Sequence, residues 1–237
     1  MADNTSAMEI CLFARPGLLD YHEAWEVQKT IARLRGAGSA PDTLILLEHP
    51  HTYTLGRRGK LSDVLVDETA LERMGVQVCY VDRGGEVTYH GPGQIVGYPI
   101  VDVRHLGGPV AYVRALEAVI VHALGDFGLE ARRRDDLTGV WVGNEKIAAI
   151  GVKISRGITT HGFALNVNTD LSYFQYIVPC GMRGMGVTSM DRLLGGSVDL
   201  EEVSLDLAHH FGLLFGRTMQ ETAGQSLHPQ LAGVAPV

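Results

Sequence analysis

Two segments of this sequence place residue types that could do chemistry among glycines that would expose them. The first is RGGEVTYHGPGQ, residues 83–94, in which four glycines accompany Arg83, Thr88 and His90. Because glycine adopts positive φ and permits close backbone approach, we expect a loop whose N–H groups wrap a ligand. The segment matches neither GxGxxG nor GxxxxGK[ST], so a nucleotide phosphate loop is not expected. The alternative is a long turn with incidental polar residues.

The second segment is IVPCG, residues 177–181, which places Cys180 between a proline and a glycine. A thiol at such a turn is exposed by its backbone, as an attacking nucleophile must be. Cys11 and Cys79 lie instead in apolar stretches typical of strands, where we expect inert thiols. Three cysteines at these positions form neither a disulfide framework nor a CxxC zinc pair.

A nucleophilic thiol needs a partner, because its ordinary pKa of ~8.5 leaves only a few per cent thiolate at neutral pH. The candidates are His90, His161 and Lys146. Lys146 could also be a simple cation at an exposed strand end, and His161 an ordinary core histidine. No histidine has a convincing metal-ligand spacing, so we assign no metal and no cofactor.

Composition excludes several classes of protein. The chain has 237 residues, 20 Lys+Arg and 27 Asp+Glu, for a formal net charge of −7. Non-specific nucleic-acid binding needs a surplus of cations and is not expected. No run approaches 18 apolar residues, so no membrane helix is expected. The first residues, MADNTS, lack the basic-then-apolar order of a signal peptide, and we expect a cytoplasmic protein.

The apolar patterning favours an α/β (α+β) fold, with a mixed or antiparallel sheet flanked by helices. Strands are expected at 9–14, 43–48, 76–81 and 95–103. Helices are expected from Pro16 to Gly36 and at 68–74, 109–127 and 200–215. Segments 139–142, 146–155 and 158–168 are joined by turns too short for a parallel crossover, which predicts an antiparallel meander. We expect one domain over residues 1–220 and a flexible tail over 221–237, which is rich in Ala, Gly, Pro and Gln.

Five motifs together carry a resemblance to a known family. RGGEVTYHGPGQ (83–94), KIAAIG (146–151), HGFALNV (161–167), IVPCG (177–181) and TSM (188–190) resemble, in this order and spacing, the octanoyltransferases, also called lipoyl(octanoyl) transferases. The similarity covers roughly residues 9–216. It implies the α/β fold of lipoate- and biotin-protein ligases. It also implies transfer of an octanoyl group from acyl carrier protein to a lysine of a lipoyl domain, in lipoate biosynthesis.

The resemblance also implies the site. The catalytic Cys/Lys pair of the family falls on Cys180 and Lys146. Its substrate-contacting stretches fall on Arg83, Gly84, Gly85, Glu86, Val87, Thr88, Tyr89 and His90, on Ala149, Ile150 and Gly151, and on His161, Gly162 and Phe163. Many members have Ser where Ala149 stands, so a contact there would come from the backbone. The implied partners are octanoyl-acyl carrier protein as donor, and as acceptors the apo lipoyl domains of lipoate-dependent dehydrogenase complexes and the glycine cleavage H protein. We expect a monomer.

Thioester chemistry then sets further expectations. Cys180 thiolate would take the octanoyl group as an acyl-enzyme, with Lys146 favouring the thiolate and moving protons. Glycine-rich surroundings at Gly151 and Gly181 could supply oxyanion donors. An apolar slot could gain about 5 kcal/mol from six methylenes, and we predict that Tyr89, His90, Ile150 and Phe163 line it. The basic clusters Arg57, Arg58 and Lys60, and Arg132, Arg133 and Arg134, could dock acidic carriers or could be solvated surface charge.

Three alternatives remain at this point. An ATP-dependent lipoate or biotin ligase of the same fold would need no nucleophilic cysteine. A cysteine thioesterase would pair Cys180 with His90 or His161 and release free acid. A non-catalytic lipoyl- or acyl-binding module would use neither Cys180 nor Lys146.

Overall fold

A large mixed sheet forms the centre of the molecule. The computed structural model describes residues 8–178 and 186–228, so Cys180, Gly181 and the last nine residues lie outside the described part. In the described part the strand order is β12-β1-β2-β6-β10-β9-β8-β7, with β11 paired to β9. The strands are β1 (Glu9–Leu18), β2 (Asp42–Glu48), β6 (Gln94–Ile100), β7 (Arg132–Arg133), β8 (Val140–Val142), β9 (Glu145–Ser155), β10 (Ile158–Asn166), β11 (Gly186–Val187) and β12 (Arg217–Glu221).

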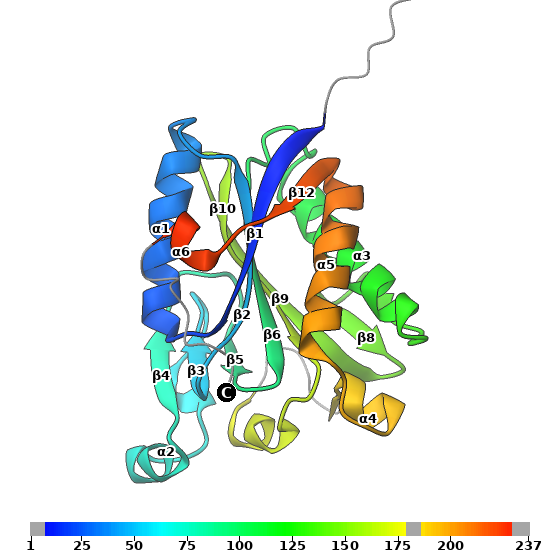
Figure 1. The fold of residues 1–237 in the computed structure, drawn as a ribbon. Helices are drawn as coiled ribbons and strands as arrows, with labels where there is room; N and C mark the ends of the chain where they lie inside the picture. Colours follow the sequence, from blue (N-terminus) through cyan, green and yellow to red (C-terminus); the bar gives the residue numbers. More distant parts are fainter. Residues whose placement is uncertain (1–7, 179–185, 229–237) are drawn as a thin grey trace, which may run out of the picture.

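Helices cover both faces of this sheet (Figure 1). The apolar strand β2 shows why, because alternate side chains point to opposite faces. Leu44 and Leu46 pack in the core beneath α3 (Pro109–Asp126) and α5 (Leu200–Phe215). Ile45 and Leu47 pack on the other face, beneath α1 (Tyr21–Gly36). The sheet is therefore the middle of three layers, as the expected fold class requires.

A second, smaller sheet lies beside the first and was not expected. Its order is β4-β3-β5, formed by β4 (Gln77–Tyr80), β3 (Thr52–Leu55) and β5 (Val87–His90). Strand β5 lies inside the segment expected to be a loop, so that expectation is wrong for residues 87–90. The loop expectation holds on either side, where Gly85 and Gly93 have φ of +91° and +79°. Helix α2 (Glu68–Met74) connects β3 to β4, and a 3₁₀ turn, Leu61–Asp63, precedes it.

The first helix begins later than expected. Strand β1 continues through Pro16 to Leu18, with a register shift between Ala14 and Gly17. Gly17 has a φ of +78°, and the Asp20 side chain accepts hydrogen bonds from the backbone N–H groups of the next turn. Asp20, rather than Pro16, is therefore the residue that starts the helix.

The expected meander is confirmed, because β8, β9 and β10 pair antiparallel in chain order. Residues 221–228, the described part of the expected tail, carry secondary structure. Glu221 ends β12 opposite Phe13, and α6 (Gly224–Leu227) follows, with Leu227 packed against the core on the α1 side. The remaining described elements are α4 (Met190–Leu194) and the 3₁₀ turn Leu171–Tyr176.

A buried carboxylate fastens three of these elements. Asp42, only 2% exposed, accepts hydrogen bonds from Arg35 Nε at 2.7 Å, Arg217 Nε at 2.9 Å and the Asp102 backbone N–H at 3.0 Å. We expect Asp42→Ala to lower the free energy of unfolding by about 3–5 kcal/mol, because two partly buried guanidinium groups lose their acceptor. Urea denaturation measures this loss.

The matched control is Glu201→Ala, which removes one exposed ion pair to Arg15 at 3.0 Å. It should cost no more than about 1 kcal/mol. Equal losses in the two variants would contradict the role given to Asp42.

No helix in the ranges 8–178 and 186–228 has the length and apolar character needed to cross a membrane.

Candidate active site

An open cavity of about 870 Å³ lies where the two sheets meet. It is lined from the small sheet by Thr88 and His90, and from the large sheet by residues of β6, β9 and β10. Helix α1 adds Tyr21, and the turn before β8 adds Thr138.

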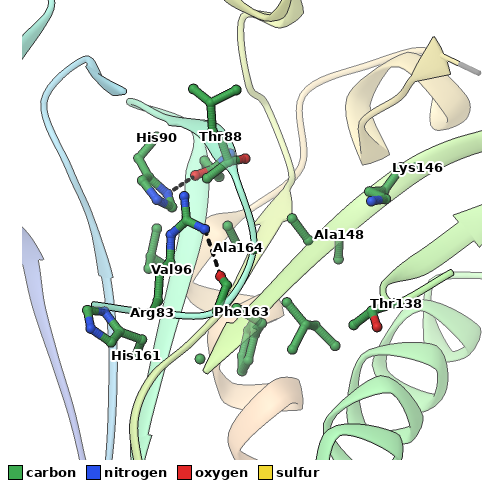
Figure 2. A pocket seen from close by; sticks show the side chains of 18 of the residues that line it. Arg83, Thr88, His90, Val96, Thr138, Lys146, Ala148, His161, Phe163 and Ala164 are labelled. Carbon is green, nitrogen blue, oxygen red and sulfur yellow. Dashed lines mark hydrogen bonds between the residues drawn. The ribbon is translucent and has the colours of Figure 1, made fainter. Parts of the chain in front are cut away.

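The structure brings almost all of the expected site residues together around this cavity. Its wall includes Lys146, Arg83–Thr88, His90, Ala149–Gly151 and His161–Phe163. Figure 2 shows Lys146 on one side, with Arg83, His90 and His161 on the other. These residues come from segments up to 80 positions apart. They are brought together by strands β5, β9 and β10 and by the 83–86 loop.

Tyr89 is the exception among the described residues. Because side chains alternate along a strand, Thr88 and His90 face the cavity while Tyr89 faces away. Its ring stacks on Tyr173 with centroids 4.9 Å apart, and its hydroxyl lies 2.8 Å from His51 Nδ1. The prediction that Tyr89 lines an acyl slot is therefore wrong, whereas His90, Ile150 and Phe163 do lie on the cavity wall.

Lys146 is held by its backbone on both sides. It pairs with Trp141 of β8 and with Val187 of β11, and its carbonyl accepts from the Thr188 N–H at 3.0 Å. Its ammonium lies 4.9 Å from the centre of the Trp141 ring. Gly139 leaves room for the lysine, since a Cβ there would lie 3.2 Å from Lys146 Cε and 2.7 Å from the Ala148 carbonyl oxygen.

Arg83 is a buried cation whose described acceptors are all neutral oxygens. Its guanidinium donates to the Thr54 hydroxyl and carbonyl, to the Gly84 carbonyl and to the Glu86 carbonyl, at 2.7–3.2 Å. Burial lowers the pKa of this group from its ordinary value. These bonds tie the 83–86 loop to β3, so Arg83 fixes the shape of the cavity rim.

Both cavity histidines are buried, and burial disfavours the charged form of each. Burial lowers the pKa of His161 to about 4, even though Asp82 Oδ1 lies 2.8 Å from its Nε2. Burial, His49 and Arg83 lower the pKa of His90 well below its ordinary value. His161 also has a φ of +58°, a strained conformation for a residue with a side chain. Neither environment favours an imidazolium beside a thiolate.

The other two thiols match the expectation of inert packing residues. Burial raises the pKa of Cys11 to about 12 and that of Cys79 to about 11. Both residues lie in strands, β1 and β4, and both are buried. Cys180, the expected nucleophile, lies outside the described residues, so its role stays a prediction.

Comparison with known proteins decides the family. The lipoyl protein ligase A/B catalytic domain family matches residues 20–212. An octanoyltransferase of Solibacter usitatus is 54% identical over 209 residues, covering 88% of this chain and 94% of the relative. An octanoyltransferase of Rubrobacter xylanophilus is 50% identical over 203 residues, covering 85% and 91%. The chain belongs to the octanoyltransferase family. The resemblance drawn from the five motifs is confirmed.

Solved structures share the fold of this octanoyltransferase at low sequence identity. A lipoate-protein ligase A bound with ATP superposes with a TM-score of 0.78, at 18% identity over 95% of this chain and 92% of that one. A biotin protein ligase from Aquifex aeolicus gives a TM-score of 0.52, at 12% identity over 87% and 70%. The expected ligase-type fold is confirmed.

Sequence reasoning missed several residues that line the cavity of the octanoyltransferase. Gln94 and Asn166 stand inside the quoted motifs and could have been found there as polar residues in otherwise apolar strands. Tyr21, Tyr98 and Phe174 gave no signal, because each lies in a segment that reads as ordinary scaffold.

One described group of side chains could supply three ligand atoms to a metal ion. Asp126, Asp206 and His210 have ligand atoms within 4.8 Å of one another. None of them lines the cavity, and a hydrogen bond of 2.7 Å between His210 Nε2 and Asp126 Oδ2 already accounts for part of the arrangement. The group has no part in the chemistry considered below.

Proposed function

We propose that this octanoyltransferase moves the octanoyl group of octanoyl-acyl carrier protein to a lysine of a lipoyl domain through a thioester on Cys180. One observation carries the proposal. In a chain of this family, Lys146 and every residue of the three expected substrate-contacting stretches except Tyr89 line one open cavity. The donor is a thioester and the product an amide, so the transfer is downhill without ATP.

Cys180 and Lys146 account for the acyl and proton transfers of both steps. The Cys180 thiolate attacks the carbonyl carbon of the donor thioester, and the carrier leaves as a thiol after gaining a proton. The lysine amine of the acceptor then attacks the acyl-enzyme, the C–S bond breaks, and the amine loses a proton, so that the amide forms and the Cys180 thiolate is restored. In the first step the Lys146 ammonium favours the thiolate and gives its proton to the departing carrier sulfur, and the neutral amine that results takes the acceptor proton in the second step. Backbone N–H groups near Gly151 and Gly181 stabilise the oxyanion.

Intact-protein mass spectrometry tests the two steps separately. Mixing with octanoyl-carrier protein should add one octanoyl group to the chain, and apo lipoyl domain should then remove it and gain the same mass. No ATP is required. A mass gain that needs ATP and free octanoate would favour a ligase. Release of free octanoate without acceptor would favour a thioesterase, and no adduct at all would favour a binding module.

The acyl slot gives a second prediction. Phe163 is 3% exposed on the cavity wall, and its ring crosses β6 at Gly97, where a Cβ would lie 2.2 Å from Phe163 Cζ. We expect Phe163→Ala to open the slot and raise the relative kcat/KM for decanoyl over octanoyl donors by about 10-fold, the order set by one or two methylenes. Transfer assays over a series of acyl lengths measure this ratio.

Gly97→Ala is the opposite variant, because the added methyl must push the Phe163 ring into the cavity. It should favour hexanoyl over octanoyl donors. An unchanged length profile in both variants would remove Phe163 from the slot.

The proposal also covers the partners of the enzyme, its oligomeric state and its location in the cell. The donor is octanoyl-acyl carrier protein, and the acceptors are apo lipoyl domains of lipoate-dependent dehydrogenase complexes and of the glycine cleavage H protein. The enzyme acts as a monomer in the cytoplasm. Size-exclusion chromatography with light scattering tests the monomer.

The basic loop after β3 lies where a carrier would approach. The Arg57 and Arg58 N–H groups donate to the carbonyls of Arg83 and Gly85, on the cavity rim, and both arginine side chains are exposed. We expect Arg57→Glu with Lys60→Glu to lower kcat/KM for the acidic carrier by about 10-fold at low salt, and added salt to shrink the difference. Steady-state kinetics at several ionic strengths measure it.

The second basic cluster provides the control. Arg132 and Arg133 lie on the edge strand β7, and neither lines the cavity. Arg132→Glu with Arg133→Glu should leave kcat/KM unchanged. If the β7 variant lowers kcat/KM and the Arg57/Lys60 variant does not, the carrier docks at β7 and not at the loop after β3.

A further inference from the structure

A buried chain of side-chain hydrogen bonds crosses from the small sheet to the large one along the cavity wall. Thr54 Oγ1 lies 3.2 Å from His90 Nε2, and His90 Nδ1 lies 2.9 Å from Gln94 Oε1. Gln94 Nε2 donates to Asn166 Oδ1 at 2.9 Å, and Asn166 Nδ2 donates to the Thr188 carbonyl at 3.0 Å. All five residues are at least 95% buried.

The two ends of this chain fix the direction of every bond in it. At one end Arg83, which can only donate, gives two N–H groups to Thr54 Oγ1, so the single Thr54 proton is left for His90 Nε2. At the other end Gln94 Nε2 also donates to the Tyr89 carbonyl at 3.1 Å, which turns Gln94 Oε1 toward His90. Both ends therefore require that His90 carries its proton on Nδ1 and accepts on Nε2.

The far end of the chain reaches the strand that carries Lys146. Pairing between β9 and β10 ends at Ala148 opposite Leu165, and Ala148 follows Lys146 by two residues in the chain. Beyond that point β11 takes the place of β10, with Val187 opposite Lys146 and the Thr188 N–H donating to the Lys146 carbonyl. Asn166 is the side chain that holds Thr188, and hence this short strand, against β10.

We propose that Thr54, Gln94 and Asn166 are positioning residues for Lys146: with His90 fixed as its Nδ1–H tautomer, they form a relay that holds the Lys146 strand in register with the Arg83 loop. The relay has one orientation and engages both ring nitrogens of His90, so His90 moves no proton during the reaction. The effect of the relay on catalysis rests on the role proposed for Lys146. The tautomer of His90 follows from the hydrogen bonds alone and is independent of that role.

Nitrogen NMR of the full chain with ¹⁵N-labelled histidine reads the tautomer directly, and His90→Gln identifies the signal. In the wild type we expect His90 with a protonated Nδ1 and an unprotonated Nε2 at pH 7. Thr54→Val removes the donor to Nε2 without changing the shape of the side chain, so the pattern should shift toward a mixture. Thr54→Ser keeps the hydroxyl and should keep the wild-type pattern.

Steady-state kinetics of the same variants test the positioning effect on Lys146. We expect Thr54→Val and Asn166→Asp to lower kcat by about 10- to 100-fold with KM for the octanoyl donor nearly unchanged, because a small displacement of Lys146 suffices. Thr54→Ser should retain wild-type kcat. Should Thr54→Val fail to fold, Asn166→Asp carries the test, since it sets an oxygen against the Thr188 carbonyl.

The proposal fails if wild-type His90 is protonated on Nε2. It also fails if folded Thr54→Val or Asn166→Asp keeps the kcat of Thr54→Ser. A correct tautomer in a chain that forms no octanoyl adduct would instead overturn the proposed function and leave the relay standing.

Discussion

Replacing Cys180 by Ala is expected to abolish the octanoyl adduct and to lower kcat/KM for transfer by about 10⁴-fold or more, as loss of a catalytic nucleophile does. The other two cysteines cannot substitute, because Cys11 and Cys79 are buried and burial raises the pKa of each thiol. Intact-protein mass spectrometry after incubation with octanoyl-carrier protein measures the adduct. Lipoyl-domain mass measures the transfer.

Cys79→Ala is the matched control, since it removes a thiol of the same chain and should leave both readouts at the wild-type level. Cys180→Ser is the intermediate case, because an alkoxide is far harder to form than a thiolate. An adduct that survives in Cys180→Ala would sink the assignment of the nucleophile.

Lys146→Ala should lower kcat for transfer by about 10²- to 10⁴-fold, the range associated with a positioned acid or base. The variant should also move the pH midpoint of Cys180 alkylation upward. A nearby ammonium stabilises the thiolate, so its loss raises the pKa of the thiol and slows alkylation at a fixed pH. Iodoacetamide labelling across a pH series measures the midpoint.

Lys146→Arg separates the two roles of the lysine. Arginine keeps the positive charge and cannot act as a base, so the alkylation midpoint should stay low while transfer is lost. Lys29→Ala is the control: Lys29 also lies over a tryptophan ring, 3.8 Å from the centre of Trp25, but outside the cavity wall. An unshifted midpoint in Lys146→Ala would end the Cys/Lys pair.

The helices whose bounds were predicted correctly are marked by residues at their own ends. The bounds of α2 and α5 agree with expectation because each begins after an aspartate cap, Asp67 or Asp199, and ends at a left-handed glycine, Gly75 or Gly216. The start of α1 was wrong because proline is common in the first turn of a helix. Pro16 instead sits in an irregular stretch of β1, which only the pairing with β2 determines.

Non-local pairing explains the errors at the site. Strand β5 could not be found from its own residues, because what makes it a strand is its pairing with Thr52–Leu55, some 35 positions earlier. Residues 87–90 were not expected to form a strand, so their side chains were not expected to alternate between two faces. Tyr89 was therefore placed in the acyl slot together with His90. The identity of the site residues came from the family resemblance. Their convergence on one cavity needed the register of two sheets, which no single segment encodes.

Both outer strands of the large sheet limit how another chain could add to it. At one edge β12 exposes Arg217–Glu221, a short strand with a charge at each end, and at the other β7 is only two arginines long. Short, charged edges discourage strand addition and the aggregation that follows from it. The edges of the large sheet therefore disfavour strand addition by a carrier or lipoyl domain, and we expect such partners to be recognised by loops and side chains around the cavity instead.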